Sequence, residues 1–160
     1  MHPSKKIAAS LAEVTEVCRD CKKNGEVIVL TSGCFDLLHG GHLEYIYDAG
    51  KYGYLIVGIN SDAFVKKLKG ENRPIRNQQD RAFIISGFFP VKHVVVFDCD
   101  IELISAVKPD VYVTSLTSHV LLSDDVERSS LLQKLNTRIV EIGSKKSDST
   151  TSIIRRAVAI

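Results

Sequence analysis

Short runs of apolar, largely β-branched residues recur along this chain and alternate with segments of helical pattern. The runs cover residues 27–30, 54–59, 94–97, 111–113 and 138–142, and the helical patterns cover 41–51, 79–89, 101–107, 126–136 and 150–158. Because the runs are nearly continuous in apolar residues, they indicate strands that are buried on both faces of a sheet. Strands that alternate with helices in this way predict an α/β fold with a doubly wound parallel sheet of about five strands.

Composition and charge place the chain among ordinary globular proteins. It has 160 residues, of which 44% are apolar and 25% charged, and a net charge of +2. We therefore expect one domain over residues 1–160, with an N-terminal helix over 1–24 and an α/β core over 25–160. The small net charge argues against a nucleic-acid partner, and no apolar stretch is long enough to predict a membrane span.

The cysteines of the chain suggest a reducing compartment. Four cysteines occur without a secretory signal pattern, so we expect reduced thiols and a cytoplasmic location. Cys18 and Cys21 have the spacing of a redox motif or of half a zinc site. They lie inside a helical stretch rather than after a strand, and Cys34 and Cys99 stand alone. We interpret the pair as two thiols on one helix face.

The turn after the first predicted strand carries the most distinctive chemistry. There, His39 and His42 are separated by Gly40 and Gly41 where a helix begins. A helix N-terminus presents free backbone N–H groups and a partial positive charge, which together favour phosphate. Glycine lets a ligand approach the backbone closely, and residues three apart in the first helical turn face the same way. The turn thus predicts an anion site.

Two common phosphate motifs, G-x-G-x-x-G and G-x-x-x-x-G-K-S/T, are absent here, which argues against a dinucleotide site or a P-loop kinase. Instead, residues 33–42, Gly-Cys-Phe-Asp-Leu-Leu-His-Gly-Gly-His, resemble the His-x-Gly-His motif of the cytidylyltransferase-like nucleotidyltransferases. The resemblance extends through Asn-Ser-Asp at 60–62, Leu-Lys-Gly-Glu-Asn-Arg-Pro at 68–74, Gln-Asp-Arg at 79–81 and Ser-Thr-Thr-Ser-Ile-Ile at 149–154. It is nearest to the adenylyltransferase domain that activates heptose 1-phosphate, and glycerol-3-phosphate cytidylyltransferase is more distant.

This resemblance implies a Rossmann-like nucleotidyltransferase fold and a transferase that moves a nucleoside monophosphate from ATP to a sugar phosphate resembling heptose 1-phosphate, with release of pyrophosphate. Two alternatives stay open. One is a CTP-dependent enzyme acting on glycerol 3-phosphate or a similar alcohol phosphate, and the other is a nucleotide-binding module without turnover. The partners would be a nucleoside triphosphate with Mg²⁺ and a small phosphorylated acceptor, with no nucleic acid and no membrane. The sequence leaves ATP or CTP, and a homodimer or a monomer, undecided.

The resemblance also implies roles for particular residues. His39, His42 and Lys69 would be catalytic, and Lys66 would bind the acceptor. The nucleotide would contact Gly33, Cys34, Phe35, Asp36, Gly41, Arg81, Ser149, Thr150 and Thr151. Each role has a structural alternative: the Ser-Thr-Thr segment is a good helix cap, Arg81 could pair with Asp62 or Asp80, and residues 66–77 could be a solvated basic loop. We expect that loop to be irregular, and mobile until a triphosphate binds.

Two departures from the family pattern bear on the acceptor and the base. Related enzymes carry a Gly-Gly-Asp or Gly-Asp-Asp element after the fourth predicted strand, whereas residues 113–119 read Val-Thr-Ser-Leu-Thr-Ser-His. The glycerol-phosphate members place an arginine ahead of the Ser-Thr-Thr segment, where this chain offers Lys145 or Lys146. A lysine lacks the bidentate fork of an arginine, so its contact with a phosphate would differ.

Overall fold

The computed structural model describes residues 2–116, 125–143 and 149–159. Within these ranges, six parallel strands form one sheet in the order β1-β4-β3-β2-β5-β6. The strands are β1 (Ile7–Ala8), β2 (Ile28–Gly33), β3 (Tyr54–Asn60), β4 (Val91–Phe97), β5 (Val111–Ser115) and β6 (Arg138–Ile142). The predicted α/β class with a doubly wound parallel sheet is therefore confirmed, with one strand more than expected.

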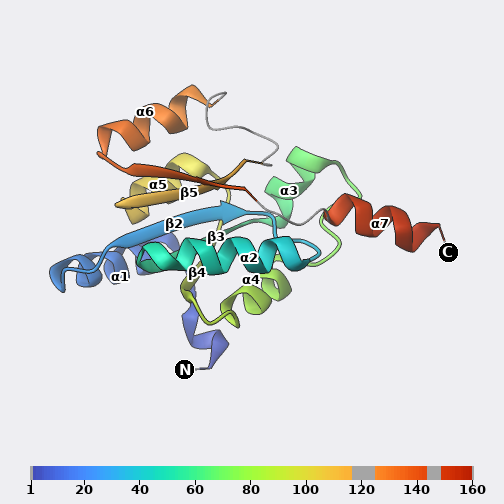
Figure 1. Ribbon diagram of the computed structural model, residues 1–160, viewed down its shortest axis with the longest axis horizontal. Helices are drawn as coiled ribbons and strands as arrows, with labels where there is room; N and C mark the ends of the chain where they lie inside the picture. Colours follow the sequence, from blue (N-terminus) through green and yellow to red (C-terminus); the bar gives the residue numbers. More distant parts are fainter. Residues whose placement is uncertain (1, 117–124, 144–148, 160) are drawn as a thin grey trace.

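Helices cover both faces of this sheet. They are α1 (Leu11–Lys23), α2 (Gly40–Ala49), α3 (Asp62–Lys69), α4 (Gln78–Ser86), α5 (Asp100–Val107), α6 (Val126–Lys134) and α7 (Thr150–Val158), with short 3₁₀ turns at Pro3–Lys6 and Gly50–Tyr52. Helices α2 and α4 lie on one face and α1 and α5 on the other, while α7 extends away from the body beyond the start of α2 (Figure 1). None of the helices in the described ranges is long and apolar enough to cross a membrane.

The continuous apolar strands follow from this layering, because successive side chains of a strand point to opposite faces. In β2, Ile28 and Leu30 enter the core under α1 and α5, whereas Val29 enters the core under α2 and α4. In β3, Ile56 points to the first core and Leu55 to the second. All five side chains are fully buried, and burying one such side chain contributes about 1.5–3 kcal/mol.

The strand order has a switch point between β2 and β5. From β2 the chain proceeds to β3 and β4 on one side, and then crosses to β5 and β6 on the other side. In open parallel sheets a ligand binds outside the carboxyl ends of the strands at such a reversal. The turn that carries the paired histidines directly follows β2, so the fold places it at this position.

The first residues fold differently from the helix expected over 1–24. Helix α1 begins only at Leu11, where the Ser10 hydroxyl accepts a hydrogen bond from the backbone of Glu13. Before it, Ile7 and Ala8 form β1, which pairs with Val94 and Val95 of β4. A strand of two residues has no periodicity that a sequence can reveal, and its pairing partner is distant in the chain.

The expectation of an irregular segment over 66–77 is wrong in its first part. Helix α3 runs to Lys69 and buries Val65, and at its start the Ser61 hydroxyl accepts a hydrogen bond from the backbone N–H of Phe64. It ends at Gly70, whose φ of +92° is readily adopted by glycine. Only residues 70–77, which we call the basic loop, connect α3 to α4 without helix.

Helix α1 carries the Cys18 and Cys21 pair. Both side chains are buried on the helix face that packs against the sheet. Burial, followed by the charge of Cys21, raises the pKa of Cys18 to about 12. A thiol with so high a pKa is a poor nucleophile at neutral pH, which agrees with a packing role.

Candidate functional site

The turn between β2 and α2 is compact because of its glycine and its aromatic ring. Phe35 has a φ of +45°, and its ring lies so near Gly33 that a Cβ on Gly33 would approach Phe35 Cε2 at 3.0 Å. The ring is buried, and its centroid lies 5.5 Å from that of His42. Gly33 and Phe35 thereby fix the path of the turn up to the histidines, which supports their placement in the site.

The two histidines lie side by side at the start of α2. Their ring centroids are 3.9 Å apart, with an angle of 38° between the ring planes. His39 is the N-cap residue, and its Nδ1 accepts a hydrogen bond of 3.2 Å from the backbone N–H of the buried Gly41. A neutral imidazole that accepts at Nδ1 carries its proton at Nε2. His39 can therefore donate from Nε2 to an anion beyond the helix end.

His42 is held in its neutral form by its surroundings. Burial is the main cause, followed by electrostatic interactions with His39 and Lys69, and together they lower its pKa to about 4. Its Nδ1 is buried without a hydrogen-bond partner among the residues that the structure describes. An unsatisfied buried polar atom costs about 1–3 kcal/mol, so a ligand that completes its hydrogen bonding would be favoured.

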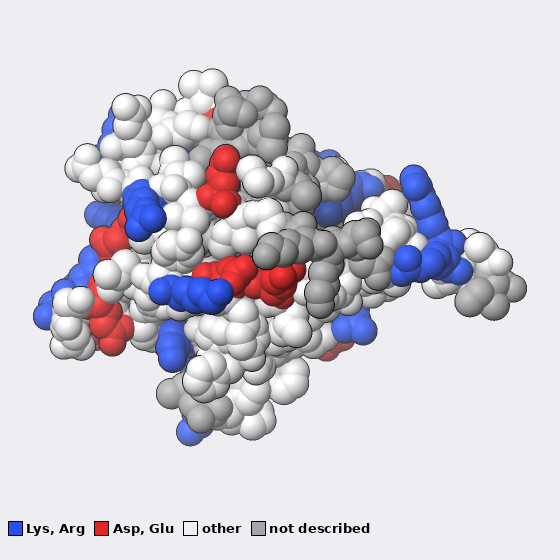
Figure 2. Space-filling view, viewed as in Figure 1, with Lys and Arg blue, Asp and Glu red and all other residues white. Residues whose placement is uncertain are grey.

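Lys69 of α3 lies near His42. Lys69 lies near enough to lower the pKa values of both His42 and Cys34, although burial is the largest influence on Cys34 and raises its pKa overall. Lys66 is exposed and lies one turn before Lys69, so the two lysines share one helix face with Asp62. Figure 2 shows lysine and arginine side chains over the end of the molecule formed by α3 and α7.

Asp36 has internal partners instead of an open carboxylate. It is 2% exposed and accepts hydrogen bonds from Arg73 Nε at 2.7 Å and from the backbone N–H groups of Ile75 and Arg76 at 2.9 Å each. Burial alone would raise its pKa, but these hydrogen bonds and the Arg73 charge hold the pKa below its ordinary value. We therefore assign Asp36 to fastening the basic loop, in place of the nucleotide contact that the sequence suggested.

Arg81 is likewise occupied by protein groups. Its side chain is fully buried and donates to the carbonyl oxygens of Cys34 at 2.6 Å, Asn60 at 2.7 Å and Arg76 at 3.0 Å, and to Asp62 Oδ1 at 2.7 Å. Of the alternatives weighed from the sequence, the ion pair with Asp62 is the one present. Because Arg81 ties the ends of β2 and β3 to the basic loop, it positions the site rather than reaching into it.

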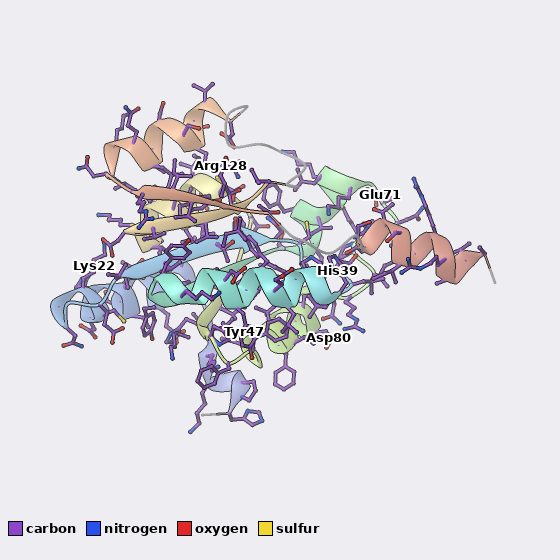
Figure 3. All side chains as sticks on the ribbon, in the orientation of Figure 1. Lys22, His39, Tyr47, Glu71, Asp80 and Arg128 are labelled. Atoms are coloured by element: carbon purple, nitrogen blue, oxygen red, sulfur yellow. The ribbon has the colours of Figure 1, made fainter. Side chains whose placement is uncertain are left out.

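The N-terminus of α7 lies against the histidine turn. Ser149 caps the helix: its hydroxyl accepts from the Ser152 backbone at 3.1 Å, and its backbone N–H donates to the Ser152 hydroxyl at 3.0 Å. The Thr150 hydroxyl donates to the Leu37 carbonyl at 3.0 Å. Thr151 is exposed and has no hydrogen-bond partner among the described residues, so its hydroxyl is the one open to a ligand. His39 and Glu71 lie at this same end of the molecule (Figure 3).

Two features of this region were missed in the sequence. The Ser32 hydroxyl lies 3.3 Å from Asp100 Oδ1 and 3.4 Å from the Tyr112 hydroxyl, forming a polar cluster beside the switch point. Burial raises the pKa of Asp100 despite the nearby Arg128. The second feature is Arg73, whose Nη2 is buried without a hydrogen-bond partner among the described residues. Of these residues, Asp100 was within reach of sequence reasoning, because it closely follows the predicted strand 94–97 and so lies at the carboxyl edge of the sheet.

Two segments singled out in the sequence lie wholly or partly outside the described residues. The first is the segment 113–119 that replaces the Gly-Asp element, of which residues 117–119 are outside. The second is Lys145 with Lys146, which are both outside. The described part of the first segment ends β5 at Ser115 and continues to the exposed Leu116.

The donor chemistry of the site bears on a metal ion. No cluster of three or more histidine, cysteine or acidic side chains that could hold a metal occurs within the described ranges. Asp36, three residues before His39, is committed to Arg73 and to backbone N–H groups. Mg²⁺ prefers several water and phosphate oxygens to an all-protein cage. These residues therefore fit an ion that arrives with a triphosphate.

Comparison with known proteins agrees with this geometry. A family model described as cytidylyltransferase-like matches residues 30–156. Among curated proteins, the bifunctional protein HldE of Wolinella succinogenes is 43% identical over 139 residues, covering 83% of this chain and 29% of its own length. HldE of Helicobacter pylori (strain G27) is 45% identical over 136 residues, covering 83% of this chain and 28% of its own length. The chain thus spans about three tenths of the length of these relatives.

Solved structures share the fold. The lipopolysaccharide core biosynthesis protein of Thermoplasma volcanium superposes with a TM-score of 0.63 at 26% identity, over 78% of this chain and 100% of that chain. Pantoate-beta-alanine ligase of Francisella tularensis, complexed with beta-gamma ATP and beta-alanine, superposes with a TM-score of 0.60 at 15% identity. It covers 96% of this chain and 78% of the ligase, and at this identity the likeness concerns the fold alone.

Proposed function

The chain belongs to the cytidylyltransferase-like family, and on that premise we propose that it transfers AMP from ATP to heptose 1-phosphate and releases pyrophosphate. The observation that carries this proposal is the pair of imidazoles, 3.9 Å apart at the N-terminus of α2. The choice of ATP and a sugar phosphate is supported by the HldE relatives and by the motifs shared with the heptose-phosphate adenylyltransferase domain.

The reaction needs little covalent help from the protein. A phosphate oxygen of the acceptor forms a bond to the α-phosphorus of ATP, and the bond from that phosphorus to the bridging oxygen of the β-phosphate breaks. The electron pair leaves with pyrophosphate. Because the attacking oxygen is already anionic, no general base is required, and catalysis consists of alignment and charge stabilisation. Mg²⁺, bound through the triphosphate, would neutralise part of the negative charge.

The described side chains suit these two tasks. Neutral His42 and the Nε2–H of His39 would donate to oxygens of the triphosphate as negative charge shifts toward the leaving group. Lys69 would add a positive charge beside them. The backbone of α7 at its N-terminus and the Thr151 hydroxyl would hold the nucleotide from the opposite side. Lys66, on the same face of α3, would attract the acceptor.

Pyrophosphate release tests the proposal directly. ATP and CTP are each combined with heptose 1-phosphate and with glycerol 3-phosphate in the presence of Mg²⁺. We expect turnover with ATP and heptose 1-phosphate, and at least tenfold lower kcat/KM for the other combinations, equivalent to roughly 1.4 kcal/mol of discrimination. Preference for CTP and glycerol 3-phosphate would replace the proposed substrates. Nucleotide binding by calorimetry without pyrophosphate release from any pair would contradict an enzyme.

A further inference from the structure

We propose that Arg73 is a phosphate-binding residue of this site, held in position by Asp36 and directed at the phosphate monoester of the acceptor. The identity of the acceptor rests on the proposed function, whereas the existence of an anion site at Arg73 does not. The sequence motifs indicated lysines as the phosphate-binding residues of this region, whereas the side-chain contacts indicate Arg73.

The guanidinium of Arg73 is fixed but only partly used. Its Nε donates to Asp36 Oδ2 at 2.7 Å, and its side chain is 13% exposed. The backbone N–H of Arg73 donates to the Gly70 carbonyl at 3.1 Å, which fastens the main chain as well. Nη2 is buried and has no hydrogen-bond partner among the described residues. The basic loop, the Asp36 carboxylate and the Arg73 guanidinium are thus fixed by hydrogen bonds, while Nη2 of Arg73 lacks an acceptor.

A structural role alone leaves that donor unexplained. An arginine that only fastened the loop would gain by satisfying all of its buried N–H groups, because leaving one unsatisfied costs about 1–3 kcal/mol. Asp36 receives backbone hydrogen bonds from Ile75 and Arg76, so the loop is already tied to the turn without the arginine. The unsatisfied buried donor is better explained by an acceptor atom that a ligand supplies.

The charges around this position favour an anionic ligand. Arg73, Arg81 and Lys69 all lie near enough to lower the pKa of Cys34, whereas Asp36 raises it. Asp36 neutralises Arg73, and Asp62 neutralises Arg81. Lys69 has no ion-pair partner in the described part of the chain, so this region carries excess positive charge. A phosphate monoester would supply the missing negative charge.

The location points to the acceptor rather than to the nucleotide. Asp36 and Arg73 lie on the β3 side of the histidine turn, since α3 and the basic loop follow β3. The switch-point crevice lies on the other side, between β2 and β5, and it is there that parallel sheets bind nucleotides. With the nucleotide in that crevice, the β3 side is left for the acceptor phosphate.

Substitution of Arg73 tests this assignment, because it should change KM for heptose 1-phosphate and not KM for ATP. Arg73→Lys keeps a charge beside Asp36 but loses the planar fork, and Arg73→Gln loses both. We expect KM for heptose 1-phosphate to rise about 10- to 100-fold, as for the loss of a hydrogen bond to a charged group, while KM for ATP changes less than about twofold. Arg76→Gln is the matched control, because Arg76 is exposed and only its backbone takes part in the network.

A second readout does not depend on turnover. The Nε–H of Arg73 is hydrogen-bonded to Asp36, so its ¹H–¹⁵N signal can be followed in the wild-type protein and assigned by through-bond correlations along the Arg73 side chain. We expect inorganic phosphate and heptose 1-phosphate each to shift this signal in the absence of ATP. The measurement also decides the matter if the substituted proteins fail to fold.

The outcomes distinguish this inference from the proposed function. An unchanged KM for heptose 1-phosphate in folded Arg73 variants, or a rise in KM for ATP alone, would overturn the assignment. An Nε–H signal that stays fixed at saturating phosphate and heptose 1-phosphate would do the same. If wild-type protein released no pyrophosphate but the signal shifted with phosphate, the proposed reaction would fall and the anion site at Arg73 would stand.

Discussion

The hydroxyl of Thr150 donates a hydrogen bond of 3.0 Å to the carbonyl of Leu37, and this contact joins the start of α7 to the histidine turn. We expect Thr150→Val to weaken ATP binding about two- to tenfold, because one hydrogen bond contributes about 0.5–1.5 kcal/mol. Thr150→Ser, which keeps the hydroxyl, should bind as the wild type does. Titration calorimetry measures both, and a loss of affinity in Thr150→Ser with none in Thr150→Val would show that the methyl group matters instead.

The paired imidazoles should contribute mainly to turnover. Alanine at either His39 or His42 removes a donor to the transition state, so we expect kcat to fall about 100- to 1000-fold, as for a lost oxyanion-hole donor. The free energy of unfolding in urea should change far less than the activity, because both rings lie at the edge of the core. Near-normal kcat in either alanine variant would exclude that residue from catalysis.

The stability of the protein should depend on pH through two groups near the turn. His42 has a pKa of about 4 in the folded chain and an ordinary value of 6.5, so the unfolded chain binds its proton first. The free energy of unfolding should therefore decrease as pH falls from 6.5 toward 4. Asp36 has a folded pKa below 3.8, so its contribution is present above that pH and is lost as pH falls through the folded pKa.

Urea titrations at several pH values check both parts of this dependence. His42→Gln should flatten the slope between pH 6.5 and 4, and Asp36→Asn should flatten it only at lower pH. Asp36→Asn should also lower stability at neutral pH by up to about 3–5 kcal/mol, since it leaves a largely buried Arg73 without its charge partner. A slope that neither substitution alters would show that other groups govern the acid response.

Lys69 should act at the barrier more than in nucleotide binding. We expect Lys69→Ala to lower kcat while the Kd for ATP changes little, the pattern of an interaction that strengthens in the transition state. Lys67→Ala is the matched control, because Lys67 is exposed and lies on the same short helix as Lys69. Calorimetry with ATP beside a pyrophosphate assay separates the two effects. A loss of affinity equal to the loss of turnover would make Lys69 a binding residue.

Activity should require Mg²⁺ although the protein alone binds it weakly. The described residues provide no acidic cluster for the ion, so its oxygen ligands would come from the triphosphate and water. Removal of Mg²⁺ with a chelator should abolish pyrophosphate release, and readdition should restore it. Calorimetry with Mg²⁺ and no nucleotide should give no measurable binding at concentrations that saturate activity. Tight binding without nucleotide would contradict this.

The strands and most helices were predictable because their signals are local. Residues 27–30 and 54–59 are apolar at consecutive positions, and this pattern reports burial on both faces wherever the partner strands lie. Helix α7 was expected at 150–158 and is found at Thr150–Val158, because its hydroxyl cap and its apolar spacing occur within one segment. Local signals failed for β1, whose two residues become a strand only by pairing with β4.

Inside the candidate site, residue types were predictable and their partners were not. The sequence identified Asp36 and Arg81 as polar residues near the histidines. It could not show that Asp36 meets a residue 37 positions later or that Arg81 meets the carbonyl of Cys34, 47 positions earlier. The sequence suggested an irregular segment over 66–77. Its first part instead belongs to helix α3, and the backbone N–H groups of Ile75 and Arg76 donate to Asp36.

The buried pair Cys18 and Cys21 has a consequence for how the protein can be studied. Their thiols lie under α1, whereas Cys34 and Cys99 are half-buried. A thiol reagent reaches the first two only when α1 lifts from the sheet, so the rate of their modification measures the free energy of that local opening. The rate of thiol modification at Cys18 and Cys21 therefore reports how firmly α1 packs on the sheet. This report is independent of the residues that would bind phosphate, because α1 lies apart from them in the fold.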